Sequence, residues 1–556
     1  MAAVGGTVKR RPPHIVCYAP YTNWSIHSAR QVTILQALRL RGCSVSYVAC
    51  DGVYPACDMT QPANGAALEA GDRACLICQS SVAARLAAWG MPYRWLGRWL
   101  RSADFQHARD WAAALKSAEL SAVCYEDIKA DGTHEIWKLG AWVKSSVHTH
   151  LRHNILDLDD PQVAQVYTRY LQSGLLACLG LSRLFDQERP AVQLLFNGRM
   201  SSTRIALELA KLRGIRTICE ERSPVAGRLT LYDNAHCLDL SGADALWAAW
   251  KDLPLTTDEI AATAGVLEDR WRGRSTDVSA FSKGMEDQAQ VRARLNLSGD
   301  KRLWVLFTSS VDESVDEPRA TGIYPTQAAW IEATVAYARS HGDIQMVIRI
   351  HPNTGGPRAL GRNPQDQAFY QTLAADLPAN VRVVPGNDDT SSYTLAAMAD
   401  LGLIWYSTIG VEMTALGRPV IRAGASWLAD CDFFMTAGDP AAYIVALEAA
   451  RQSPQRATMD QVAGAWRFTY MWYFRQTIAF PLVTQPTWFQ GEPAYKAPDA
   501  LAPGKDSGLD HICDVIMNGA PLYPEAARRP ADMVKDESRM ISDRIAPYRT
   551  TVDAAP

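Results

Sequence analysis

Two apolar runs of the sequence each end in residues that could bind a phosphate. Arg349 and His351 stand at the end of the run 344–350, and Pro352 then blocks further strand pairing. Ligands of open α/β sheets bind outside the carboxyl ends of the strands. We therefore expect a guanidinium and an imidazole at one sheet edge, with a bond from the imidazole to a loop carbonyl as the alternative.

The second run, 401–406, leads through Ser407-Thr408 into a short helical segment that carries Glu412. A strand that passes into a helix through small hydroxyl residues directs backbone N–H groups and the positive helix end at one point. Together with Arg349 and His351, this pattern predicts a phosphate site. Glu412 would lie one turn along the helix, within reach of a ribose hydroxyl.

Polar side chains also follow two strands predicted in the first half of the chain. The carboxyl ends of parallel neighbours meet at the same sheet edge, so we expect these side chains to line a cleft. Ion pairing within the fold is the alternative for any one of them. The residues are Asn197, Arg199, Glu220, Glu221 and Arg222.

These groups together predict transfer of a sugar from a nucleotide. A nucleotide leaves with developing negative charge, which a cation, an imidazole and a helix dipole stabilise without needing a metal ion. The acceptor hydroxyl needs a general base from the first half of the chain. The candidates are Glu220, Glu221 and His27, which lies on the first strand–helix connection.

Missing motifs disfavour several common enzyme classes. Neither half contains G-x-x-x-x-G-K-[ST], and neither contains G-x-G-x-x-G after its first strand, which disfavours an ATPase and a nicotinamide enzyme. The sequence also lacks G-x-S-x-G and H-E-x-x-H, which are typical of two hydrolase classes.

The elements that must position these residues alternate along the chain. Such alternation predicts doubly wound parallel sheets, one in each half, facing each other across a cleft. In the first half we predict strands at 14–20, 44–49, 192–196 and 217–222, helices at 26–40 and 203–212, and a mostly helical region at 80–190. In the second half we predict strands at 303–307, 344–350, 381–384, 401–406 and 419–423, and helices at 325–339, 367–377, 391–398 and 408–416.

Composition changes divide the chain into three parts. Residues 1–290 form the first domain with its helical region, 291–480 the second domain, and 481–556 an extension that packs back on the core. The net charge of −3, from 56 basic and 59 acidic residues, argues against nucleic acid as the main partner. No long apolar segment or signal peptide is found, so we expect a soluble, cytoplasmic protein.

Four cysteines follow the second predicted strand. They are Cys50, Cys57, Cys75 and Cys78, in the spacing C-x6-C-x17-C-x2-C. Such a set could fix a structural zinc ion or anchor an iron–sulfur cluster. Because only one C-x-x-C is present, four unrelated small core residues are the alternative.

Taken in order, these motifs resemble the bacterial surface-polysaccharide glycosyltransferases of GT-B fold, which are related to capsule-biosynthesis proteins. The resemblance covers most of the chain from the first strand to about residue 480, including the cysteine segment. The residues that carry it are Phe196-Asn-Gly-Arg199, Glu221-Arg222, Phe307 to Glu313, Gln327, Arg349 to Asn353, Ser391-Ser-Tyr393 and Tyr406 to Glu412.

The resemblance implies two Rossmann-like domains, with a sugar nucleotide, of CMP or UDP type, bound mainly by the second and a glycan acceptor by the first. It also implies a role in capsule, O-antigen or exopolysaccharide assembly, with peripheral contact to the inner membrane face. Its implied acceptor residues are Asn197, Arg199 and Arg222. Its implied donor residues are Ser309, Ser310, Arg349, His351, Asn353, Ser391, Ser392, Ser407, Thr408 and Glu412.

The sequence departs from the family where Glu-Arg-Gly is expected, because Ser223 follows Glu221-Arg222. A glycine there would let an acceptor approach the backbone closely. Alternative functions within the fold are a nucleotide-sugar 2-epimerase and a polyol-phosphate transferase. A further alternative is a non-catalytic metal- or glycan-binding partner in an export assembly, which the cysteines and the 17 tryptophans would suit.

Overall fold

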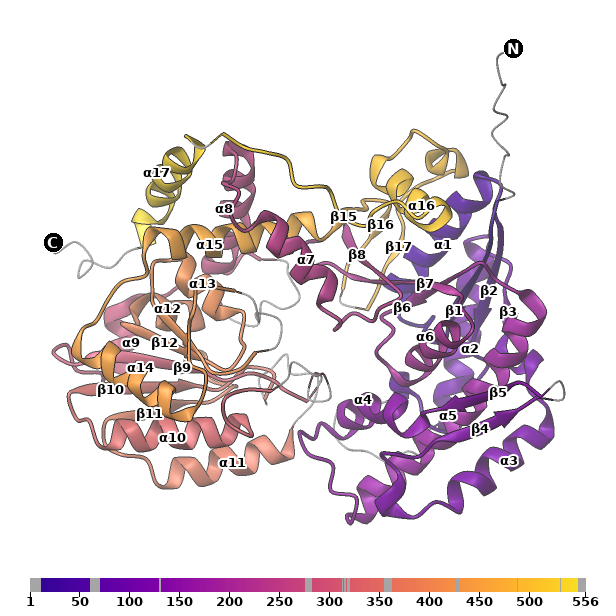
Figure 1. The fold of residues 1–556 in the computed structure, drawn as a ribbon, viewed down its shortest axis with the longest axis horizontal. Helices are drawn as coiled ribbons and strands as arrows, with labels where there is room; N and C mark the ends of the chain where they lie inside the picture. The colour runs from indigo at the N-terminus through magenta and orange to yellow at the C-terminus, as the bar shows by residue number, and fades with distance from the viewer. Residues whose placement is uncertain are drawn as a thin grey trace.

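The computed structural model describes residues 12–60, 71–129, 132–275, 283–312, 314, 317, 321–354, 363–425, 431–487, 489–530 and 532–548. Each half of the described chain contains a largely parallel sheet with helices on both faces (Figure 1). The predicted fold class, two Rossmann-like α/β domains of GT-B type with helical insertions and a C-terminal extension, is confirmed.

The first sheet has the strand order β15-β8-β7-β6-β1-β2-β3. Strands β3, β2, β1, β6 and β7 run parallel, whereas β8 and β15 join the edge antiparallel. The bounds are β1 His14–Ala19, β2 Ser44–Ala49, β3 Arg94–Trp95, β6 Val192–Phe196, β7 Arg216–Arg222, β8 Arg228–Asp233 and β15 Ile478–Ala479.

The second sheet has the order β11-β10-β9-β12-β13-β14, and all its pairs are parallel. Its bounds are β9 Arg302–Phe307, β10 Ile344–Arg349, β11 Val381–Val384, β12 Leu401–Ile404, β13 Val420–Arg422 and β14 Met435–Thr436. The two central strands, β9 and β12, and their neighbour β10 are the buried apolar runs of the sequence. Their carboxyl ends therefore lie together.

Helices cover both faces of each sheet because alternate strand residues point to opposite faces. Leu303, Val305 and Phe307 of β9 join one core cluster, and Trp304 and Leu306 join another. The helices of the first half are α1 Ser25–Leu40, α2 Gly71–Ala88, α3 Ser102–Ala113, α4 Leu139–Leu151, α5 Pro161–Glu188 and α6 Ser201–Leu212. Those of the second half are α10 Gln327–Arg339, α11 Pro364–Ala375, α12 Ser392–Met398, α13 Ile409–Ala415 and α14 Pro440–Gln452.

Three helices precede β9 in sequence yet belong to the core on one side of its sheet. They are α7 Ser241–Trp250, α8 Thr257–Trp271 and α9 Gln288–Arg294, and their apolar residues share a core with β9, α12 and α13. The division of the chain at residues 290 and 480 stays a prediction. Several elements were not predicted, among them strand β8 and the hairpin β4 Tyr125–Ile128 with β5 His134–Trp137, which lies in a region predicted mostly helical.

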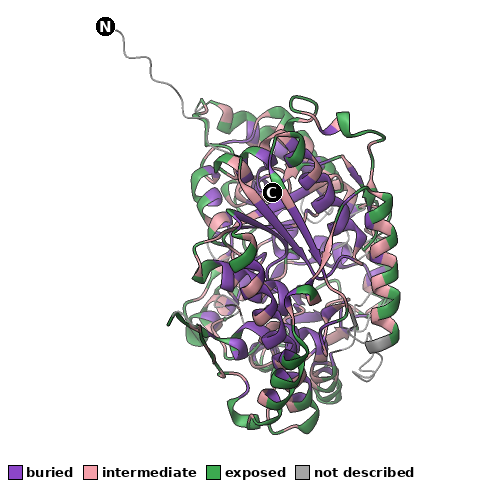
Figure 2. Ribbon diagram, turned by 90° about the vertical axis from the view of Figure 1, so that its right-hand side faces the viewer, coloured by how far each residue is buried: buried purple, intermediate pink, exposed green. Residues whose placement is uncertain are grey.

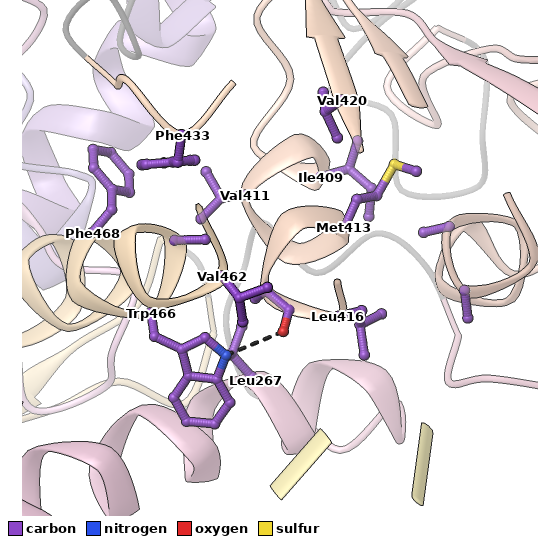
Figure 3. Packing of buried hydrophobic residues seen from close by; sticks show 14 of the residues in the cluster. Leu267, Ile409, Val411, Met413, Leu416, Val420, Phe433, Val462, Trp466 and Phe468 are labelled. Carbon is purple, nitrogen blue, oxygen red and sulfur yellow. Dashed lines mark hydrogen bonds between the residues drawn. The ribbon is translucent and has the colours of Figure 1, made fainter. Parts of the chain in front are cut away.

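Helix α13 is anchored by α15, Met459–Tyr470. The Trp466 indole N–H donates to the Ala415 carbonyl at 3.2 Å, and Val462 and Phe468 pack beside Val411 and Phe433 (Figure 3). This packing fixes the helix that carries Glu412. Buried segments, drawn purple, fill the interior in Figure 2, and the strands of both sheets are largely buried.

The extension after residue 480 contacts both halves (Figure 1). The hairpin β16 Val483–Thr484 with β17 Glu492–Pro493 and helix α16 Ser507–Asn518 pack on α1. Helix α17 Met533–Ile545 packs on α8 and α15, where Glu537 pairs with Arg467 at 2.5 Å. None of the described helices is long and apolar enough to cross a membrane.

Candidate active site

A pocket lies where the carboxyl ends of β9, β10 and β12 meet, and we name it the β10–β12 pocket. Strand geometry explains its position, because the loops that follow parallel strands converge at one sheet edge. The predicted donor residues that line it are Arg349, His351, Ser392, Ser407, Thr408 and Glu412.

Arg349 ends β10 with its guanidinium in the pocket wall. Its Nε donates to the Ser392 hydroxyl at 3.3 Å, and its Nη atoms donate to the carbonyls of Pro385 and, at 3.2 Å, Asp388. Burial lowers the pKa of Arg349 from its usual value, and the nearby carboxylates of Asp388 and Asp389 oppose this shift. Arg349 therefore holds the loop after β11 and also places positive charge in the pocket.

His351 has a defined tautomer. The backbone N–H of Asn353 donates to Nδ1 at 3.1 Å, so in the neutral ring Nε2 carries the proton. The His351 backbone N–H donates to the Thr308 hydroxyl at 2.8 Å, which fixes the residue beside β9. The ring thus has an N–H donor suited to an anionic oxygen.

Ser309, Ser310, Asn353 and Ser391 are not among the lining residues of the β10–β12 pocket. The Asn353 amide donates to the Ser310 hydroxyl at 2.9 Å, and Ser310 donates to Asp312 at 2.9 Å. Ser309 exchanges two hydrogen bonds with Gln327 through its backbone. These residues shape the loop after β9.

Ser391 is fully buried and caps helix α12. Its hydroxyl accepts from the Thr394 N–H at 3.3 Å and donates to the Lys283 carbonyl at 3.1 Å. Ser392, the next residue, does line the pocket and accepts from Arg349. Ser391 therefore caps helix α12, whereas Ser392 contributes to the pocket.

Glu412 meets a residue that sequence reasoning missed. Arg270 of α8 donates from Nε to Glu412 Oε1 at 3.1 Å, and its Nη2 lies 3.0 Å from the same oxygen. Both side chains are buried and line the pocket. The sequence does hint at the role of Arg270. It lies on the same helix face as Leu267 and Trp271, where an apolar residue would be expected.

The first half contributes a buried histidine–carboxylate pair. His27 lies in the first turn of α1, and its Nδ1 is 3.1 Å from Oε1 of Glu220 in β7. Burial lowers the pKa of His27, and the cations Arg222 and Arg30 add to the shift. Burial raises the pKa of Glu220 to about 8, and this shift is opposed by Arg30. We name these residues the His27–Glu220 pair.

The other imidazole nitrogen, Nε2, is buried and faces Glu221. His27 Nε2 has no hydrogen-bond partner among the described residues and lies 4.0 Å from Glu221 Oε1. Glu221 is held by the Asn197 amide at 2.6 Å and by the Arg222 backbone N–H at 2.7 Å. The predicted residues Glu220, Glu221 and His27 therefore come together, with Asn197 and Arg222 as supports.

Arg199 does not join this group. Its guanidinium donates to the hydroxyls of Ser145 and Thr149 in α4, at 2.9 and 3.0 Å. Its backbone N–H donates to the Asn197 side chain at 2.9 Å, which helps to hold Asn197 at a left-handed φ of 64°. Arg199 thus fastens the turn after β6 to α4.

The two halves meet at the loop after β9. Asp312 Oδ2 lies 2.8 Å from Arg152 Nη1, and Glu317 Oε2 lies 3.7 Å from His236 Nε2. His236 packs against Gly198, at the carboxyl end of β6. The carboxyl edges of the two sheets therefore face each other, which directs the β10–β12 pocket toward the first half.

The four predicted metal ligands line one pocket, together with Tyr54 and Asn23. Within the described residues, however, no group of three or more His, Cys, Asp or Glu side chains is arranged to hold a metal ion. The Cys50 and Cys57 sulfurs each accept a local backbone N–H at 3.4 Å, and burial raises the pKa of Cys50 to about 12. The structure therefore does not support a zinc or iron–sulfur site at these cysteines. The four residues are Cys50, Cys57, Cys75 and Cys78.

Comparison with known proteins finds only distant likenesses. No family model and no curated protein matches the chain. Solved structures similar to it include KpsC, a beta Kdo 2,4 transferase from Thermosulfurimonas dismutans, with 14% identity, a TM-score of 0.34, and 56% of this chain and 87% of that one covered.

Two sugar-nucleotide epimerases are also similar. The UDP-GlcNAc 2-epimerase from Neisseria meningitidis, bound to UDP-GlcNAc, has 10% identity, a TM-score of 0.24, and coverage of 82% of this chain and 95% of its own. The enzyme from Methanocaldococcus jannaschii, in complex with UDP-GlcNAc and UDP, has 10% identity, a TM-score of 0.27, and coverage of 81% and 97%. With TM-scores this low, these likenesses carry no argument, so the fold is described from its own sheets and the function is argued from the site.

Proposed function

We propose that this protein is a glycosyltransferase that moves a sugar from a nucleotide-sugar donor to a glycan acceptor in bacterial surface-polysaccharide biosynthesis. The observation that carries the proposal is the pairing of two sites on facing sheet edges. The β10–β12 pocket contains a guanidinium, an imidazole N–H and hydroxyls. The opposite edge contains a histidine that a buried carboxylate orients.

In the proposed reaction the donor phosphate occupies the β10–β12 pocket. The guanidinium of Arg349, the Nε2–H of His351 and the hydroxyl of Ser407 stabilise the charge that develops as the bond from the anomeric carbon to the phosphate oxygen breaks. Helix α13 has only 7 residues, so these side chains matter more than the helix dipole. This charge balance needs no metal ion.

The acceptor hydroxyl attacks the anomeric carbon and loses its proton to His27 Nε2. Glu220, bonded to Nδ1, orients the ring and stabilises the imidazolium that forms. The new glycosidic bond replaces the bond to phosphate, and the nucleotide leaves with the electron pair. Glu221 lies 4.0 Å from Nε2 and is placed to bind the acceptor hydroxyl.

Nucleotide binding tests this proposal. We would measure the thermal stabilisation of the protein by CMP, CDP, UDP, GDP and dTDP, and compare His351→Ala and Ser407→Ala with the wild type. Saturation at about 100 times the dissociation constant stabilises a protein by about 2.7 kcal/mol. We expect one nucleotide to stabilise the wild type and neither variant.

A matched control is His341→Ala, because His341 lies at the amino end of β10, where its Nδ1 bonds the Tyr337 carbonyl at 2.7 Å. This variant should respond to nucleotide like the wild type. No response of the wild type to any nucleotide would overturn the proposal. Conversion of the sugar nucleotide to a C2 epimer without an acceptor would favour the epimerase alternative.

A further inference from the structure

The C-terminal extension reaches the turn that precedes the candidate base. The loop of the β16–β17 hairpin lies on residues 24–26, because the Ile26 N–H donates to the Phe489 carbonyl at 3.3 Å and the Gly491 N–H donates to the Ser25 hydroxyl at 2.9 Å. His27 is the next residue of α1. The extension is therefore part of the wall around the His27–Glu220 pair.

This contact creates an aromatic surface. The rings of Trp24 and Phe489 are stacked, with centroids 5.5 Å apart and planes 25° apart. Trp24 also meets Phe196 edge to face at 5.7 Å, and Phe196 lies 3.7 Å from the His27 ring. One ring therefore separates the stacked pair from the candidate base.

The surface remains accessible. Phe489 is 38% exposed, and Trp24 is half-buried. The Trp24 indole N–H bonds no described residue. A flat apolar ring face with an adjacent N–H donor suits a ligand that has an apolar C–H face and hydroxyls at its rim. Sugar rings have this character.

We propose that Trp24 and Phe489 form a subsite for a sugar ring of the acceptor glycan, so that the C-terminal extension completes the acceptor site. The inference rests on the proposed function for the identity of the bound sugar as acceptor. The apolar face of the sugar ring packs on the exposed Phe489 ring of the stacked pair, and a ring hydroxyl accepts from the Trp24 indole N–H. The hydroxyl to be glycosylated then points past Phe196 toward His27 Nε2.

Sugar binding can be measured without a donor. The probes are the methyl glycosides of glucose, galactose and N-acetylglucosamine, detected by saturation-transfer NMR with the full chain. We expect at least one glycoside to receive saturation at its ring C–H protons. Trp24→Ala and Phe489→Ala should each raise its dissociation constant about tenfold, as expected for loss of an aromatic contact.

Two variants serve as controls. Trp24→Phe keeps the ring face and should bind within about threefold of the wild type. Phe105→Ala removes a phenylalanine of similar exposure, 36%, from α3, and should bind like the wild type. Wild-type binding by Trp24→Ala and Phe489→Ala, or no saturation of any glycoside by the wild type, would overturn the inference.

The outcome is distinct from that of the nucleotide test. If the wild type binds glycosides through Trp24 but no nucleotide, the proposed function fails and the sugar subsite stands. If nucleotide stabilises the wild type and Trp24→Ala equally, while glycoside binding is the same in both, the subsite fails and the proposed function stands. In steady-state transfer, a supported subsite raises the acceptor KM in Phe489→Ala and leaves the donor KM unchanged.

Discussion

Arg152 and Asp312 form an ion pair, with Nη1 and Oδ2 2.8 Å apart, that joins the segment after α4 to the loop after β9. Only 9% and 1% of the two side chains are exposed. Asp312 also accepts from Ser310, whose hydroxyl is bonded by Asn353 next to the β10–β12 pocket. The pair therefore connects the first half of the chain to the loop after β9.

We expect Arg152→Ala to cost about 3 kcal/mol of stability, because removing one partner leaves a buried charge uncompensated. The donor KM should rise as the loop after β9 loses its anchor. Thermal unfolding and steady-state kinetics measure the two effects. The control Arg339→Ala breaks an ion pair whose side chains are 47% and 87% exposed and should change stability by less than about 1 kcal/mol. Equal effects of the two variants would contradict this prediction.

The raised pKa of Glu220, about 8, predicts a pH dependence of transfer. If ionised Glu220 stabilises the imidazolium of His27, kcat/KM should rise about tenfold per pH unit below that pKa and level off above it. Glu220→Gln should lower kcat/KM and remove this dependence. A pH profile of the wild type and the variant tests the assignment. An unchanged slope in the variant would remove Glu220 from this role.

The same pKa predicts how stability changes with pH. The folded protein keeps a proton on Glu220 that the unfolded chain releases near the usual glutamate pKa of about 4.3. The free energy of unfolding should therefore fall as pH rises from about 4.3 to about 8, by at most about 1.4 kcal/mol per pH unit from this group. Unfolding at several pH values in the wild type and Glu220→Gln measures the contribution, and the difference between them should shrink toward pH 4.

If Glu412 contacts a ribose hydroxyl, the wild type should distinguish a nucleotide from its 2′-deoxy form, and Glu412→Gln should not. The wild type should bind its nucleotide at least about tenfold more tightly than the 2′-deoxy form, since a hydrogen bond to a charged group is lost in the latter. In Glu412→Gln this ratio should approach one, whereas Ser407→Ala should weaken both nucleotides and keep the ratio. Calorimetric titration of the wild type and the two variants gives the three ratios. A preserved ratio in Glu412→Gln would leave Arg270 as the main partner of Glu412.

A substitution at Gly491 tests how tightly the β16–β17 hairpin must pack on α1. A Cβ there would lie 2.6 Å from Ile26 Cδ1 and 2.7 Å from Ile26 Cα, and one of these contacts is with backbone. Gly491→Ala should therefore displace the hairpin, cost about 1–3 kcal/mol and weaken glycoside binding. Gly438→Ala is the control, because its Cβ would meet no atom within 4 Å. If Gly491→Ala has the stability and sugar binding of the wild type, the hairpin accommodates the added methyl group and the prediction is wrong.

The second sheet could be predicted from sequence because its strands are continuous apolar runs between helices of regular period. Strands β9, β10 and β12 lie at the predicted places, and their ends bring Arg349, His351 and Ser407 to one pocket. A strand that is buried on both faces needs apolar residues at every position, so it appears in the sequence as a continuous apolar run. The same reasoning located Glu220 and His27 on elements that meet.

The missed features depend on contacts between distant segments. Arg270 is 142 residues from Glu412, so no local pattern connects them. Strands β16 and β17 are two residues long, too short for a periodic signal. Cysteine spacing predicted a metal site because spacing does not specify where the sulfurs point. The resemblance predicts Ser391 as a donor residue, but its N-cap position on α12 accounts for its hydroxyl.

The hydrogen bond between Gly491 and Ser25 spans 466 residues of sequence. During synthesis, which proceeds from the amino end and allows domains to fold in turn, His27 and Glu220 leave the ribosome long before Phe489. The aromatic surface is thus the last part of the site to be made. A chain cut short by a premature stop after residue 480 would retain every described residue of the β10–β12 pocket and the His27–Glu220 pair, yet lack the wall that Phe489 provides.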